Sequence, residues 1–254
     1  MAKEMTFDKY IDNPSGGSVY TNRNMYKNMY KSKFDKVLVR EQGRIKYELY
    51  VAKDNVDSHY VYLKIPSEVV PNFYYDVVIQ FYTKNVVYKN EKTLRRYSVK
   101  FYSNDPAFAY TFAHSFKQNE LFISDLEARM PKQLLKNKAK IKNPKDEVWY
   151  VKSLFFAYLA MEKYNLFSKA MFSNQYRKKE LLNKIAPAEI KIAKRQEEGK
   201  KIEKQKAKEA EEKKKEKQTA RNVNISVPQT KISKTSKVSK VSNSVKKTKI
   251  IGKR

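Results

Sequence analysis

The sequence lacks the residues on which most catalytic and metal-binding motifs depend. Its 254 residues include no cysteine, which excludes disulfides, thiolate nucleophiles and zinc sites built on cysteine. The two histidines, His59 and His114, fall on an expected inward strand face and on a phenylalanine-rich helix, so we interpret both as structural. The five glycines form no phosphate-binding loop, and neither a zinc-protease helix motif nor a nucleophile elbow is present. We therefore expect a protein that is not an enzyme and that has no cofactor and no metal site.

Long apolar segments are also missing. The longest uncharged apolar run, residues 154–161, is too short to cross a bilayer. Residues 1–8 lack the apolar core of a secretion signal. We therefore expect no transmembrane segment and an intracellular location.

Acidic residues are scarce relative to basic ones. The chain has 55 lysines and arginines against 27 aspartates and glutamates, which gives a formal net charge of +28. A field of this strength attracts polyanions, so nucleic acid, an anionic membrane or an acidic protein is the leading class of partner.

Alternation of apolar and polar residues is the clearest structural signal that is present. In residues 44–51 every second residue is apolar, which is the period of a half-buried strand. The pattern returns in residues 59–65, 73–82 and 94–102, and shorter apolar runs at 36–39 and 86–88 favour two further strands. Strands at this spacing predict a small antiparallel β-barrel or sandwich.

The outward residues of these strands mix cations with tyrosines, a combination typical of surfaces that bind phosphates and stack on bases. The candidate phosphate contacts are Lys46, Lys64, Arg96 and Lys100, and the candidate stacking residues are Tyr50, Tyr62, Tyr82 and Tyr102. Two alternatives stay open: helices cover this face, or tyrosine is present for its strand propensity.

Helical periodicity begins after the strands. Asp105 or Asn104 as N-cap and Pro106 at the first helical position predict a helix in which Phe108, Phe112 and Phe116 align for core packing. A short helix or extended segment is expected at residues 121–130, and helices are expected at 146–165 and 174–185. The predicted fold class is therefore α+β.

Residues 132–145 form a basic connection with six lysines and no acidic residue. These lysines either contact phosphates or belong to a solvated loop. Further along, residues 188–220 contain glutamate and lysine four residues apart but no apolar seam. That composition predicts a single exposed charged helix.

The C-terminal residues 221–254 carry ten basic residues and no acidic one, and part of this segment repeats a three-residue unit that begins with lysine. Such a composition predicts disorder. The candidate nucleic-acid contacts there are Lys231, Lys234, Lys237, Lys240, Lys246, Lys247, Lys249, Lys253 and Arg254. The alternatives are docking of this tail on an acidic protein surface and a solubilising end with no partner.

Four regions follow from these composition changes. We expect an N-terminal arm at residues 1–33, a globular domain at 34–186, the exposed helix at 187–220 and the tail at 221–254.

In composition the chain resembles the structural and accessory proteins of low-GC tailed bacteriophages. It shares the lack of cysteine, the few glycines beside 19 tyrosines and 13 phenylalanines, and the lysine-rich end. The resemblance implies a cytoplasmic or virion-associated protein.

Two function hypotheses result. The first is a non-enzymatic nucleic-acid-associated protein that binds the phosphate backbone through its basic tail and the tyrosine and lysine face of its strands. The alternative is a bacteriophage virion structural or assembly protein. Its folded domain would dock in a protein shell, as a homo-oligomer or beside other proteins, and its tail would contact the genome or acidic partners. DNA and RNA are both open.

Overall fold

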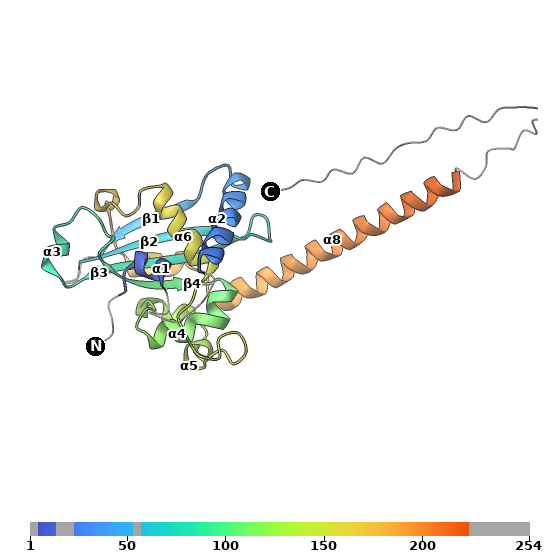
Figure 1. Ribbon diagram of the computed structural model, residues 1–254. Coiled ribbons are helices and arrows are strands. Elements are labelled where there is room, and N and C mark those ends of the chain that lie inside the picture. The colour runs from blue at the N-terminus through green and yellow to red at the C-terminus, as the bar shows by residue number, and fades with distance from the viewer. Residues whose placement is uncertain (1–4, 14–22, 53–56, 224–254) are drawn as a thin grey trace, which may run out of the picture. The chain divides into compact units, whose positions relative to one another are not determined.

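A five-stranded sheet forms the centre of the structure. The computed structural model describes residues 5–13, 23–52 and 57–223 (Figure 1). The strands are β1 (Lys46–Val51), β2 (Asp57–Pro66), β3 (Tyr74–Thr83), β4 (Ser98–Ser103) and β5 (Asn174–Gln175), in the order β4-β3-β2-β1-β5. Strands β1 to β4 pair antiparallel, whereas β5 runs parallel to β1. The α+β class is confirmed.

The sheet is open, so the expected barrel or sandwich is wrong. A barrel needs β4 to pair with the opposite edge, but the outer edge of β4 already has partners. The N–H of Val99 donates to the carbonyl of Met5 at 2.8 Å, and the N–H of Phe101 donates to the carbonyl of Leu121 at 2.7 Å. These short segments protect the edge strand without continuing the sheet.

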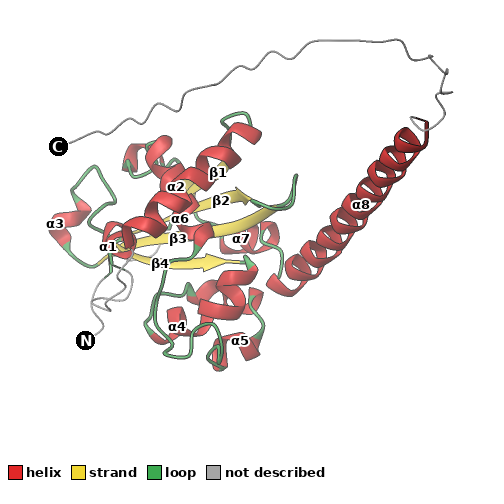
Figure 2. Cartoon of the chain, turned by 45° about the vertical axis from the view of Figure 1, so that its right-hand side comes forward, coloured by secondary structure: helices red, strands yellow, loops and turns green. Residues whose placement is uncertain are grey.

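Helix α6 (Lys152–Lys163) packs against β2, β3 and β4 on the apolar face of the sheet (Figure 2). Val61, Ile79 and Phe101 lie opposite one another across three strands, and each is fully buried. The alternation in the sequence therefore predicted the inward face of these strands correctly.

Helix α2 (Arg23–Arg40) replaces an expected strand at residues 36–39 and contains the boundary expected between arm and globular domain. The reason lies in its spacing, because Tyr30, Phe34 and Val37 share one helical face. Tyr30 meets Phe155 with ring centroids 5.6 Å apart, and Phe34 meets Phe156 at 5.5 Å. Val37 is buried on the same face, so helical packing on α6 takes precedence over its strand propensity.

Several shorter helical elements complete the layers. They are α3 (Val86–Lys89), η1 (Phe108–Phe112), α4 (Ala113–Gln118), η2 (Ser124–Arg129), α5 (Lys132–Lys136), η3 (Lys169–Met171) and α7 (Lys178–Lys184). The strand expected at residues 86–88 is thus the helix α3. The predicted helix start at Asp105 is confirmed, since its carboxylate accepts from the N–H of Ala107 at 3.0 Å. A π-helical turn in η1 follows, and Phe108 and Phe116 pack with centroids 5.1 Å apart.

Helix α6 is shorter than the helix expected at residues 146–165, and α1 (Phe7–Asp12) supplies the reason. The hydroxyl of Tyr10 donates to the carbonyl of Trp149 at 3.0 Å and accepts from the N–H of Val151 at 3.2 Å. The hydroxyl of Tyr150 donates to the carbonyl of Ile11 at 3.1 Å. Backbone groups that a longer helix would bond internally are therefore bonded to α1.

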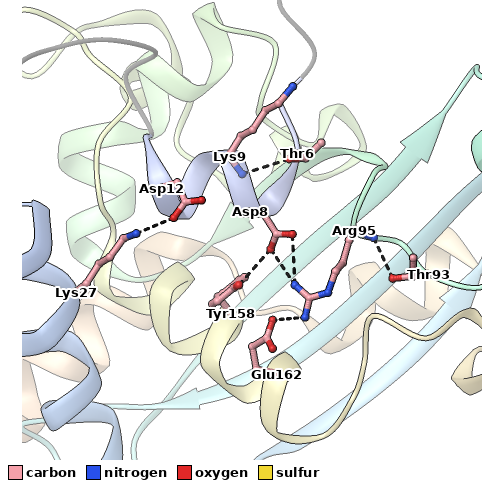
Figure 3. A network of polar contacts seen from close by, with 9 residues as sticks. All are labelled: Thr6, Asp8, Lys9, Asp12, Lys27, Thr93, Arg95, Tyr158 and Glu162. Atoms are coloured by element: carbon pink, nitrogen blue, oxygen red, sulfur yellow. Dashed lines mark hydrogen bonds and ion pairs between the residues drawn. The ribbon is translucent and has the colours of Figure 1, made fainter.

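The residues expected to form a separate arm include part of the core, since Phe7 and Tyr10 of α1 are fully buried. A polar network also holds α1 (Figure 3). Arg95 donates to Asp8 at 3.0 Å and to Glu162 at 2.6 Å, and the hydroxyl of Tyr158 donates to Asp8 at 3.1 Å. One guanidinium group thus joins α1 to α6.

The chain divides into two compact units, residues 1–204 and 205–254. Helix α8 (Ala188–Val223) begins in the first unit, where Ala188 and Ile192 are buried. In the second unit, the side chains described at residues 205–217 are exposed and belong to lysine, glutamate, glutamine and alanine. None of the described helices combines the length and the apolar character that spanning a bilayer requires.

We predict that Arg95→Met destabilises the protein by about 1–2 kcal/mol, because the carboxylates of Asp8 and Glu162 lose their shared donor. Urea denaturation measures the change. Arg96→Met is the matched control, since Arg96 is 66% exposed and forms an exposed ion pair with Glu91, and it should cost less than about 0.5 kcal/mol. Equal destabilisation by both substitutions contradicts the role given to Arg95.

Candidate functional site

Three of the four tyrosines expected to stack on bases lie inside the protein. Tyr50, Tyr62 and Tyr102 are 4%, 2% and 0% exposed. The second face of the sheet is covered, because Lys184 of α7 donates to the hydroxyl of Tyr50 at 3.0 Å and Tyr102 donates to the carbonyl of Arg129 at 3.2 Å. The expectation that these three tyrosines stack on bases is therefore corrected.

A buried carboxylate organises this face. Asp76 is 2% exposed and accepts from the hydroxyl of Tyr62 at 2.8 Å and from the amide of Asn104 at 2.7 Å. The side-chain oxygen of Asn104 accepts from the N–H of Asp76 at 2.8 Å. Burial and the negative charge of Asp76 raise the pKa of Tyr62, so its hydroxyl remains a donor. These tyrosines serve the fold.

Removal of the Tyr62 hydroxyl tests this assignment. We predict that Tyr62→Phe destabilises the protein by about 1–2 kcal/mol, because a buried carboxylate loses a donor. Tyr74→Phe is the control, since Tyr74 also donates to a carboxylate, that of Glu41 at 2.7 Å, but from a half-buried position. Its cost should stay below about 0.5 kcal/mol in denaturant unfolding. A neutral Tyr62→Phe would show that the buried pair does not stabilise the sheet.

The remaining residues of the strands that were expected to contact nucleic acid lie at separate positions on the protein. Lys46 and Lys64 are directly opposite each other on β1 and β2, and Lys64 lies 3.9 Å from Asp76. At another position on the sheet, the ammonium of Lys100 lies 5.4 Å from the ring centre of Tyr82. Arg96 is exposed and pairs with Glu91 at 3.0 Å. The structure does not join these residues into one surface.

The C-terminal candidates from Lys231 to Arg254 lie outside the described residues. Their assignment as nucleic-acid contacts stays a prediction.

Unpaired cations without any acidic neighbour in the same segment lie at residues 132–145, which we call the lysine loop. All six of its lysines are exposed, and none pairs with a carboxylate in the part of the chain that the structure describes. They are Lys132, Lys136, Lys138, Lys140, Lys142 and Lys145. Exposure and the lack of acidic partners are compatible with both readings left open by the sequence, contact with phosphates and a solvated loop.

Two buried side chains hold the lysine loop on the body. Leu135 of α5 is 4% exposed. Asn143 is 7% exposed, and its amide donates to the carbonyl of Thr111 at 3.3 Å and to that of Glu147 at 2.9 Å. Its side-chain oxygen accepts from the N–H of Glu147 at 3.0 Å. The loop is therefore anchored near both ends.

A cleft of about 540 Å³ opens between the lysine loop and α4. Its lining consists of His114, Lys136, Asn137, Lys138 and Lys140. The histidine was expected to be structural, and its Nδ1 does contact the carboxylate of Asp146 at 2.7 Å. Sequence reasoning missed the contribution of His114 to the cleft, because the chain gives no signal that α4 faces residues 136–140. The acid-free run of lysines was the signal that was visible.

A second basic cleft, of about 520 Å³, differs from the first in that carboxylates pair with its cations. It is lined in part by Arg95 and Arg96, but Asp8, Glu162 and Glu91 pair with these guanidinium groups. The cleft at the lysine loop has no carboxylate in its lining, so its positive charge stays available to a ligand.

Comparisons with known proteins add no assignment. No protein-family model, curated protein or solved structure matches the chain. Within the described residues, no group of three histidine, aspartate or glutamate side chains is placed to hold a metal ion.

Proposed function

We propose that the protein is a non-enzymatic nucleic-acid-associated protein that binds the phosphate backbone through the lysine loop and the lysines of its C-terminal tail. The observation that carries this proposal is the set of six exposed lysines in an acid-free segment, without carboxylate partners among the described residues. Cations that approach phosphates release condensed counterions, and this release drives binding without reading the base sequence.

The chemistry of the lysine loop suits contacts with phosphates that do not depend on a fixed geometry. The loop has six lysines and no arginine. The guanidinium fork of arginine fixes the geometry of a carboxylate or phosphate partner, whereas the ammonium group of lysine attracts a phosphate as a point charge. A nucleic acid also presents phosphates at short, regular intervals, so one strand offers several phosphates to the lysines of the loop.

The salt dependence of binding tests the proposal. The intact chain and a variant with all six loop lysines changed to glutamine are titrated with a single-stranded oligonucleotide, by fluorescence anisotropy, across a salt series. We predict that the variant binds more weakly. The slope of log K against log salt should become shallower by about 0.7 for each lysine that contacts a phosphate.

A charge-matched control separates contact from net charge. Six exposed lysines of α8 are changed to glutamine instead, and these are Lys200, Lys204, Lys206, Lys208, Lys213 and Lys214. Because glutamates of the same helix lie between them, this variant should keep the slope. An equal change of slope in both variants would overturn the role of the lysine loop. Failure of the intact chain to bind at low salt would overturn the function itself.

Apolar exposure at one end of the protein favours a second candidate, a structural or assembly component of a virion. Val86 and Val87 of α3 are 70% and 66% exposed, and Met171 of η3 is 41% exposed. These segments are neighbours, since the ammonium of Lys169 donates to the carbonyl of Lys89 at 2.6 Å. Exposed apolar side chains on neighbouring segments are typical of protein contacts.

Light scattering of the intact chain distinguishes this candidate from a purely nucleic-acid-bound protein. An assembly component that uses this end should self-associate at raised concentration, and Val86→Ser with Val87→Ser should abolish the association. A wild-type chain that stays monomeric throughout gives no support to a homo-oligomeric assembly.

A further inference from the structure

The cleft between the lysine loop and α4 differs from the rest of the loop because it is concave. Its three lysines, at positions 136, 138 and 140, line an open space whose volume is within the range of small-ligand sites. Lys132 and Lys145 belong to the same loop and are equally exposed, but they do not line the cleft. A ligand in the cleft therefore meets several cations at once, whereas a strand passing over the loop meets them singly.

The end of the lysine loop is hydrogen-bonded to the segment that carries α4 before any ligand binds. Asn143 ties the end of the loop to the carbonyl of Thr111, which lies just before α4. His114 of α4 contacts Asp146 at 2.7 Å, and the N–H of Asp146 donates to the carbonyl of Asn143 at 3.0 Å. Loop and helix are thus held together by their own hydrogen bonds, which lowers the ordering cost of binding.

The donor set of the cleft fits a doubly charged phosphate. Three ammonium groups and the amide of Asn137 offer hydrogen-bond donors, and no carboxylate lies in the lining. An internal phosphodiester carries one negative charge and two free oxygens. A phosphomonoester carries up to two charges and three free oxygens, so it makes more charge-assisted hydrogen bonds in a site that surrounds it.

We propose that this cleft binds a phosphomonoester, in the form of the terminal phosphate of a nucleic-acid strand. The inference rests on the proposed function and deepens it, because it separates two parts of the lysine loop. The outer lysines contact the backbone of any strand, and the cleft recognises a phosphorylated end.

Oligonucleotides that differ only at their ends test the proposal. The intact chain is titrated at fixed salt with single strands of about twelve nucleotides, which is within the range one binding surface covers. The strands carry a 5′-phosphate, a 3′-phosphate or no terminal phosphate, and the dye is attached internally. We predict that at least one phosphorylated strand binds roughly tenfold more tightly than the unphosphorylated strand, because charge-assisted hydrogen bonds are added.

Two double variants of equal net charge test whether the preference for a phosphorylated end depends on the cleft. Lys138→Gln with Lys140→Gln removes cations from the cleft and should bring the ratio between phosphorylated and unphosphorylated strands close to one. Lys132→Gln with Lys145→Gln removes two loop cations outside the cleft, so it should weaken binding of every strand and keep the ratio. Equal affinity for all strands in the wild type overturns the proposal. So does loss of the ratio in the second variant alone.

The same experiment keeps the two proposals apart. If all strands bind with a steep salt dependence but without preference for a phosphorylated end, the inference fails and the proposed function stands. If no strand binds at low salt, both fail. Competition with adenosine monophosphate identifies the source of the phosphate. Displacement at concentrations similar to the strand assigns the cleft to mononucleotides, and weak displacement assigns it to strand ends.

Discussion

The hydroxyl of Tyr62 donates a hydrogen bond to the buried carboxylate of Asp76. The rest of the structure depends on hydrogen bonds of this kind, in which a buried tyrosine hydroxyl has a partner on another element. Tyr102 donates to the carbonyl of Arg129, and Tyr10 donates to that of Trp149. An unpaired buried hydroxyl costs about 1–3 kcal/mol, so each of these side chains requires an internal partner. The partners lie on other elements, which are thereby fixed against the sheet. Both faces of the sheet are covered as a result.

The placement of charge follows from this constraint. Tyrosine supplies large buried surfaces with a satisfied polar end, while the lysines remain at the surface because an ammonium group is costly to bury. On α8, lysines alternate with glutamates and their field is partly cancelled. In residues 132–145 no acid is present, so the positive charge of the loop is not cancelled within the segment. Asn143, which is 7% exposed, anchors the end of this loop on the body.

Sequence periodicity predicted the four main strands and their inward residues, because alternation reports which residues share a face. It did not report what covers the other face, and so Tyr50, Tyr62 and Tyr102 were misread as an open surface. Val37 was assigned to a strand because Tyr30, which shares its helical face in α2, was counted with the N-terminal arm. The lysine loop was visible as an acid-free run, but its cleft depends on contacts with α4 that are distant in sequence. The local alternation of residues thus predicted the main strands. Contacts between residues distant in sequence determined which surfaces of the sheet remained exposed to solvent.

Lysine-selective labelling, followed by mass spectrometry of the intact chain with and without polynucleotide, tests the central claim most directly. If the lysine loop is a phosphate-binding surface, the six lysines of residues 132–145 lose reactivity on binding, while the exposed lysines of α8 at residues 200–214 keep it. Protection of the α8 lysines with the loop still reactive contradicts the account. Unchanged reactivity of both sets in the bound state, which would leave binding to other residues, contradicts it as well.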